Sequence, residues 1–183
     1  ASHFAMGKTL ERKELIEFSS KTFDCYYAYV NLLGNESGRM IFDGEILLAK
    51  DGNILGRNQL LSFQDFQVLT FTLENKEQNP APIQVKEWEF VQASSLGLFD
   101  YLRKSKSKGF VLSLSGGADS STIAVLVAEM VSRGVDELGL EKFLEKIGLE
   151  YSFQTEDPKK ELVGLLLTTA YQGTSNSSED TFH

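Results

Sequence analysis

The N-terminal part of the chain begins with a pattern typical of an amphipathic helix. Residues 9–22 are mostly charged or polar, and a few apolar side chains recur among them at helical intervals. These apolar residues are Leu10, Leu15, Ile16 and Phe18. We therefore predict a helix over 9–22 that packs on one face and keeps a polar exposed side.

Strand patterns follow this helix. The aromatic and β-branched run over 25–33 predicts a strand that ends at Gly34-Asn35, and a second strand is predicted over 40–49. Asp51-Gly52 predicts a type I′ hairpin turn, because this turn needs positive φ at both central residues and Gly adopts it without strain. A short strand should follow near Ile54.

The pattern changes between residues 68 and 84. Val68–Leu73 predicts a last strand of the β-rich region. Residues 75–82 then combine Glu, Lys, Gln and Asn with two prolines, which cannot continue a central strand. We predict a first domain over 1–78, a linker over 79–84 and a second domain over 85–183.

The second part of the chain has a helical pattern. Helices are predicted over 85–103, 120–132 and 140–147, and Gly148 is the expected stop of the last one. The apolar residues expected to face inward are Trp88, Val91, Leu96, Phe99, Leu102, Ile123, Leu126, Val127, Met130, Leu140, Phe143, Leu144 and Ile147. A basic cluster follows the first helix, at Arg103, Lys104, Lys106 and Lys108. We interpret this cluster as a solvated helix end, where cations are favoured, with a phosphate site as the alternative.

Two short apolar segments flank these helices. Phe110–Leu114 and Leu162–Thr169 are each predicted to be a buried strand. Strand, helix and strand in this order form a βαβ unit with a parallel sheet. Nucleotides usually bind at the carboxyl edge of such a sheet.

Composition limits the classes of function. The 183 residues are 42% hydrophobic and 11% aromatic, which is a globular rather than a disordered composition. A net charge of −8 disfavours broad contact with nucleic acid or anionic membranes. The single cysteine, Cys25, cannot close an intrachain disulfide, and no stretch approaches the length of a spanning helix. We expect a soluble cytoplasmic protein.

One loop carries a strong chemical signature: Ser115-Gly116-Gly117-Ala118-Asp119-Ser120, between a predicted strand and a predicted helix. The glycines let backbone amides approach an anion, and the helix start adds free N–H groups. Asp119 would repel phosphate unless a divalent cation lay between them. We predict a phosphate site; the alternative is a serine-rich turn that only caps the helix.

The loop lacks the Gly-Lys-Ser/Thr of a Walker A motif, and it resembles the Ser-Gly-Gly-x-Asp-Ser motif of the ATP-pyrophosphatase superfamily. Its flanks at 96–105 and 109–114, with the tail at 171–181, are similar to glutamine-dependent NAD synthetases. Two N-terminal segments, 2–8 and 29–39, resemble the nitrilase-type glutaminase domain of those enzymes.

The resemblance implies a fold and an activity. The expected fold is α/β: the C-terminal part of a nitrilase-like αββα sandwich, followed by the first βαβ of a Rossmann-like parallel sheet. The implied reaction is the ATP-dependent amidation of deamido-NAD to NAD through an acyl-adenylate. Glutamine or ammonia supplies the nitrogen, ATP and Mg²⁺ are the expected cofactors, and a homo-oligomer is expected.

The resemblance also implies site residues. ATP would be bound by Ser113, Leu114, Ser115, Gly116, Gly117, Ala118, Asp119 and Ser120. Asp119 would be the magnesium ligand. Ser2 and Lys8 would contact glutamine, with a simple helix-entry loop as the alternative.

The chain departs from the family pattern in one important respect. Nitrilase-type glutaminases use a Glu-Lys-Cys set, which in the family lies upstream of these residues, so no catalytic residue is expected in this chain. Cys25 is predicted to fill the core of a strand instead. The chain also stops at His183, where the family continues, so we expect a fragment that is inactive alone.

Other interpretations remain open at this point. Asn176, with Glu179 three residues on, fits a helix N-cap or a nucleotide contact. His3 and His183 give no zinc signal. Another amidotransferase of the superfamily, such as a GMP synthetase, or a catalytically incomplete nucleotide-binding fragment, would also carry this loop.

Overall fold

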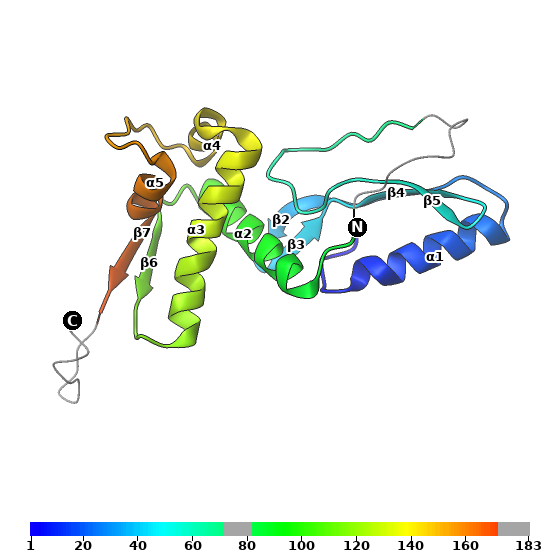
Figure 1. Cartoon of the computed structure of the whole chain (residues 1–183), viewed down its shortest axis with the longest axis horizontal. Helices are drawn as coiled ribbons and strands as arrows, with labels where there is room; N and C mark the ends of the chain where they lie inside the picture. The colour runs from blue at the N-terminus through cyan, green and yellow to red at the C-terminus, as the bar shows by residue number, and fades with distance from the viewer. Residues whose placement is uncertain (72–81, 172–183) are drawn as a thin grey trace.

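The computed structural model describes residues 1–71 and 82–171 (Figure 1). The helices are α1 (Lys8–Thr22), α2 (Lys86–Ser105), α3 (Ala118–Leu138), α4 (Leu140–Ile147) and α5 (Pro158–Leu166). The strands are β1 (Tyr27–Val30), β2 (Leu33–Ser37), β3 (Met40–Asp43), β4 (Ile46–Lys50), β5 (Asn53–Arg57), β6 (Phe110–Ser113) and β7 (Leu167–Ala170). The chain is therefore mixed α/β, as predicted. Among the described residues, no helix is long and apolar enough to cross a membrane.

The first half of the chain is a small antiparallel sheet covered by one helix. The sheet has the order β1-β4-β5, and α1 contacts its strands (Figure 1). The predicted turn at Asp51-Gly52 joins β4 to β5, and both of its residues have positive φ, 55° and 79°. The β2–β3 hairpin leaves this sheet and lies beside α2. The hairpin thus connects the first half of the chain to the second.

The prediction of α1 is confirmed, but the prediction of its buried face is wrong. Leu15 and Phe18 are 61% and 67% exposed, and of the predicted apolar residues only Ile16 is buried. The buried face is mainly polar: Thr9, Arg12, Ser19 and Ser20 accompany Ile16. The partners of this face on the sheet are charged, as described below. The spacing of apolar residues therefore did not predict which face of the helix is buried.

The strand predicted over 25–33 forms only as β1, and its expected end at Gly34-Asn35 is wrong, because both residues lie inside β2. The strand predicted over 40–49 divides into β3 and β4. The break between β1 and β2 faces the break between β3 and β4, since Asn31 N–H donates to the Glu45 carbonyl at 2.8 Å and Gly44 N–H donates to the Leu32 carbonyl at 2.8 Å. Gly44 has a φ of 68°, which lets the chain bend there. The four strands therefore belong to two sheets: β1 and β4 to one, and β2 and β3 to the other.

The strand predicted over 68–73 is not formed in its described part. Residues 68–71 are irregular, and Val68 is largely exposed. Residues 72–81, which include 79–81 of the predicted linker over 79–84, lie outside the described residues. So do residues 172–183, with Asn176, Glu179 and His183.

The second half of the chain is built around two long helices. The predicted helices near 85–103, 120–132 and 140–147 appear as α2, α3 and α4, and α3 is longer than predicted. Strands β6 and β7 pair in parallel, with Phe110 opposite Leu167 and Ser113 opposite Ala170, which confirms the predicted parallel pairing.

One predicted strand in this half is largely a helix. Residues 162–166 belong to α5, and only the end of the predicted segment forms β7. Leu162 and Leu166 are both buried, four residues apart on one helix face. The N-terminus of α5 is capped by Asp157, whose side chain accepts a hydrogen bond from Lys160 N–H at 3.1 Å. A short apolar run is compatible with a strand or with a helix, and here the N-terminal cap and the packing favour the helix.

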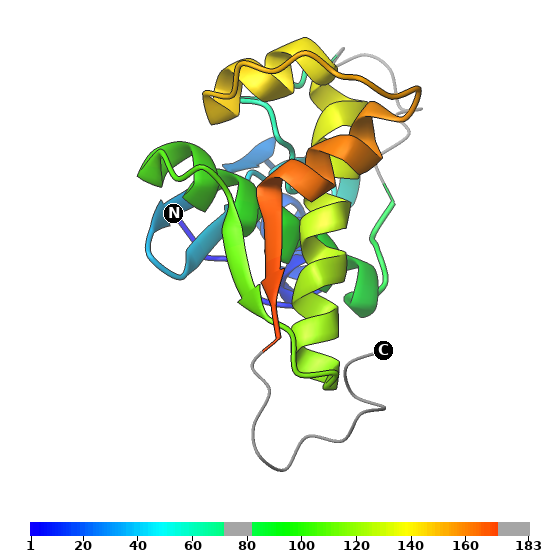
Figure 2. The same cartoon turned by 90° about the vertical axis from the view of Figure 1, so that its left-hand side faces the viewer.

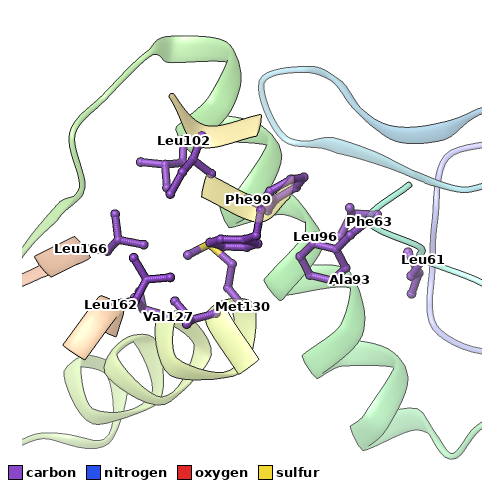
Figure 3. Close-up of a cluster of buried hydrophobic side chains, with 13 residues drawn as sticks. Leu61, Phe63, Ala93, Leu96, Phe99, Leu102, Val127, Met130, Leu162 and Leu166 are labelled. Carbon is purple, nitrogen blue, oxygen red and sulfur yellow. The ribbon is translucent and has the colours of Figure 1, made fainter. Parts of the chain in front are cut away.

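The main hydrophobic core fills the space between α2, α3, α4 and α5. Figure 3 shows side chains from these helices converging around Phe99 and Met130. Phe99 lies between the rings of Phe63 and Phe143, with centroids 5.0 and 5.5 Å away. Phe63 and its neighbour Leu61 come from the segment after β5, so the first half contributes to the core of the second. Of the predicted inward residues, Ile123 and Trp88 are instead 43% and 39% exposed.

We predict that Gly134→Ala destabilises the protein although alanine favours helices. A Cβ at Gly134 would lie 2.3 Å from Cε2 of the Phe143 ring, and overpacking of this kind costs about 1–3 kcal/mol. Gly164, on α5, has open space around it. Gly164→Ala should therefore stabilise by up to about 1 kcal/mol. Urea unfolding of both variants checks this, and equal effects would contradict it.

Candidate functional site

The glycine-rich loop lies at the carboxyl edge of the parallel strand pair. β6 runs directly into it and α3 begins at Ala118, so the loop joins the ends of both elements (Figure 2). Leu114 N–H donates to the Ala170 carbonyl at 2.8 Å, which extends the pairing to the start of the loop. Residues 115–119 are exposed, whereas Ser120 is buried. The predicted residues 113–120 are thus contiguous at this edge of the sheet.

Hydrogen bonds within the loop fix its shape. The Ser120 hydroxyl donates to the Gly117 carbonyl at 3.1 Å, and the Ser115 and Ser120 hydroxyls lie 3.4 Å apart. Gly116 has a φ of 75°, a conformation that favours glycine. Gly117, the residue before α3, is extended, and no side chain caps the helix there. The first N–H groups of α3 therefore have neither an intrahelical acceptor nor a side-chain cap.

This arrangement suits an anion. Exposed backbone N–H groups at a helix start, together with serine hydroxyls, form a site for phosphate oxygens. Asp119 is the carboxylate of the loop, and the described residues hold no group of three or more potential ligands that could bind a metal alone. Mg²⁺ commonly takes one or two protein carboxylates and completes its shell with substrate phosphates and water. Asp119 thus fits a magnesium ion that is shared with a bound phosphate.

A shallow groove of about 700 Å³ begins beside the first turn of α3. Ser121 and Thr122 line the groove together with the apolar side chains of Phe90 and Val125. Lys86, the first residue of α2, also lines the groove and adds a cation to it. Sequence analysis missed Lys86 because it lies 35 positions before Ser121 and belongs to no motif.

The N-terminal segment with Ser2 and Lys8 is held by three main-chain contacts. Ser2 exchanges hydrogen bonds with the Asn31 side chain, and Phe4 N–H donates to the Ile41 carbonyl at 2.6 Å. Gly7 N–H donates to Oε2 of Glu89, on α2, at 3.1 Å. Lys8 begins α1, and its ammonium donates to the His3 carbonyl at 3.1 Å. The structure therefore places Ser2 and Lys8 at the entry to a helix.

A cluster of buried charges includes Arg12, on the helix that this segment leads into. Arg12 Nη1 is 2.6 Å from both Oδ2 of Asp43 and Oε2 of Glu45. Oε1 of Glu45 accepts from Arg57 Nε at 3.1 Å and from the Thr9 hydroxyl at 2.8 Å. We call Arg12, Asp43, Glu45 and Arg57 the buried charge cluster. Its two cations and two anions balance, and all four side chains are nearly inaccessible to solvent.

The electrostatics of the cluster keep Arg12 charged. Burial alone would lower the pKa of Arg12, but hydrogen bonds to Glu45 and Asp43 raise it above its ordinary value. The guanidinium also lies 5.3 Å from the centre of the Tyr29 ring. Burial raises the pKa of the Tyr29 phenol against the opposing charge of Arg12, so this tyrosine stays neutral.

Cys25 is not in a strand, which corrects the prediction. It lies in the bend before β1 and is only partly buried. Its N–H donates to the Ser20 carbonyl at 3.2 Å, and the preceding residue, Asp24, has a φ of 45°. The residue therefore helps to end α1 rather than filling the core of the sheet.

Comparison with known proteins shows which family this chain resembles. A model of the NAD synthase family matches residues 90–169, which include the loop. The glutamine-dependent NAD(+) synthetase of Bos taurus is 30% identical over 98% of this chain and 32% of its own length. Residues 90–169 thus match the NAD synthase family, and nearly the whole chain is similar to glutamine-dependent NAD(+) synthetases. It spans about a third of the length of the curated relatives that it matches.

Solved structures of the family agree with the fold. The crystal structure of a glutamine-dependent NAD(+) synthetase from Cytophaga hutchinsonii is 49% identical, with a TM-score of 0.87 over 100% of this chain and 31% of that one. A synthetase from Acinetobacter baumannii, solved in complex with adenosine diphosphate, shares 22% identity and a TM-score of 0.63 over 93% of this chain and 32% of that one. The second match supports the fold alone.

We predict that Glu45→Gln destabilises the protein by about 3 kcal/mol, because it leaves a buried guanidinium charge uncompensated. Glu17, which pairs with Lys13 at a partly exposed position on α1, is the matched control. Glu17→Gln should cost less than about 0.5 kcal/mol. Chemical denaturation measures both, and a similarly small loss for Glu45→Gln would contradict a structural role for the cluster.

Proposed function

We propose that this chain is part of an enzyme that amidates deamido-NAD to NAD with ATP and glutamine. ATP adenylates the nicotinate carboxylate, pyrophosphate leaves, and ammonia released from glutamine attacks the acyl-adenylate to give NAD and AMP. The observation that carries the proposal is the Ser115–Ser120 loop, exposed over 115–119, at the carboxyl edge of a parallel strand pair and within the residues that match the NAD synthase family.

The loop residues have distinct proposed roles. The N–H groups at the start of α3 and the hydroxyls of Ser115 and Ser120 bind phosphate oxygens of ATP. Ser113 ends the strand that carries the loop, Leu114 links the strand to the loop, and Gly116 gives the loop its turn. Asp119 holds a magnesium ion. When bound, that ion neutralises charge that develops as pyrophosphate leaves.

We further propose that the first half belongs to a nitrilase-like glutaminase sandwich, with a domain over 1–78, a linker over 79–84 and a synthetase domain over 85–183. Exposed apolar residues support this proposal, because Leu15 and Phe18 on α1 and Val30 on β1 lack the cover that a larger sandwich would give. Ser2 and Lys8 would then contact glutamine. The second half would be the first βαβ of a larger Rossmann-like sheet.

The first experiment removes the proposed magnesium ligand. Asp119→Asn should lower kcat for NAD formation from deamido-NAD, ATP and ammonia by about 100-fold or more, because charge on the departing pyrophosphate is no longer neutralised in place. The assay uses the complete protein, including any sequence beyond these 183 residues. Asp136→Asn, an exposed aspartate on the same helix, is the control and should retain activity. Full activity of a folded Asp119→Asn would defeat the assignment.

The second experiment fills the space that phosphate would occupy. Gly117 is extended, and an added Cβ would meet only the Ser115 hydroxyl, at 3.4 Å, so the fold tolerates a side chain there. Gly117→Val should weaken binding of magnesium pyrophosphate at least about tenfold by crowding the N–H groups, a loss of about 1.4 kcal/mol. Titration calorimetry measures the affinity. Unchanged binding would place the phosphate elsewhere.

A further inference from the structure

The side chain of Asn31 holds the main chain of Ser2 from both sides. Ser2 N–H donates to Asn31 Oδ1 at 2.9 Å, and Asn31 Nδ2 donates to the Ser2 carbonyl at 2.7 Å. The side-chain amide thus pairs with the main-chain N–H and C=O of one residue as a neighbouring strand would, although the two residues are 29 positions apart. Two such bonds fix both the location and the direction of the chain at Ser2.

The orientation of the Asn31 amide is itself fixed. Nδ2 also donates to Oδ1 of Asp43 at 2.7 Å, and a carboxylate can only accept, so the amide nitrogen must face Asp43. The other oxygen of Asp43 is bound by Arg12. Asn31, Asp43 and Arg12 are all buried, which excludes water as a competing partner. The buried charge cluster therefore determines which way Asn31 presents its donor and acceptor to Ser2.

We propose that Asn31 is a positioning residue that places Ser2 for glutamine binding, oriented by Asp43 and Arg12. The inference rests on the proposed function, in which Ser2 contacts glutamine. The contacts of Asn31 use only main-chain atoms of Ser2, which leaves its hydroxyl outside them. Loss of these contacts would displace Ser2 and weaken glutamine binding while leaving amidation with free ammonia intact.

The chain offers a matched control in Asn58. Asn31 and Asn58 are each 8% exposed, and the side chains of both bind main-chain groups. Asn58 accepts from Ile46 N–H at 2.7 Å and donates to the Gly44 carbonyl at 2.8 Å, but it does not touch Ser2. Substitution of Asn58 therefore removes comparable structural bonds without releasing the N-terminal segment.

The test compares Asn31→Asp and Asn31→Ala with Asn58→Asp and Asn58→Ala in the complete protein. Asn31→Asp removes the donor and sets a second carboxylate against Asp43, and Asn31→Ala removes the contacts without adding charge. For a folded Asn31 variant we expect KM for glutamine to rise about tenfold or more, as two lost hydrogen bonds imply, with kcat for ammonia within about twofold of wild type. Hydrogen–deuterium exchange of residues 1–8 should quicken in the Asn31 variants only.

Three results would overturn the inference. An unchanged KM for glutamine in folded Asn31→Ala is one, an equal rise in the Asn58 variants is the second, and unaltered exchange of residues 1–8 is the third. A wild-type protein that forms NAD from neither glutamine nor ammonia would instead overturn the proposed function. The exchange measurement would then still decide whether Asn31 positions Ser2.

Discussion

The first half of the chain depends on the mutual neutralisation of two arginines and two carboxylates in its interior. Its apolar core is small, with Ile16, Leu47 and Ala49 as the buried members, so packing alone cannot fix the arrangement. Buried charges are costly unless each is paired and hydrogen-bonded, which makes the buried charge cluster favourable only as a complete set. Because the set draws on α1, β5 and the bend between β3 and β4, its completion fixes these elements relative to one another.

The two halves of the chain meet along α2. Buried hydrogen bonds hold them together there in addition to apolar packing. Asp100, buried on α2, accepts from Asn35 N–H of the β2–β3 hairpin at 2.5 Å and from Arg103 at 2.6 Å. Gly34 permits this approach, since a Cβ there would lie 2.6 Å from the Asp100 carboxylate. Glu89, on the same helix, binds the Gly7 N–H. One helix thus holds both the hairpin and the N-terminal segment while its apolar face packs against α3.

The parts of the fold that sequence could predict are those governed by local chemistry. The turn at Asp51-Gly52 and the stop of α4 at Gly148 need only the conformational freedom of glycine, and both are found where expected. The buried face of α1 could not be predicted, because Arg12 is buried only through partners 31 and 33 positions away. The helix over 158–166 was missed for a related reason. Its apolar residues suit a strand equally well, and its packing against α3 decides between them.

The two candidate sites differ in the same way: local sequence shapes one, and contacts between distant residues shape the other. Everything that shapes the Ser115–Ser120 loop lies within a few residues: glycine conformations, serine hydroxyls and the start of a helix. Such a site can be inferred from sequence alone. The surroundings of Ser2 depend instead on Asn31, Asp43 and Arg12, which no local pattern connects. Resemblance to a family pointed to Ser2 and Lys8, but only the folded chain shows that the main chain of Ser2 is hydrogen-bonded to an asparagine that the buried charge cluster orients.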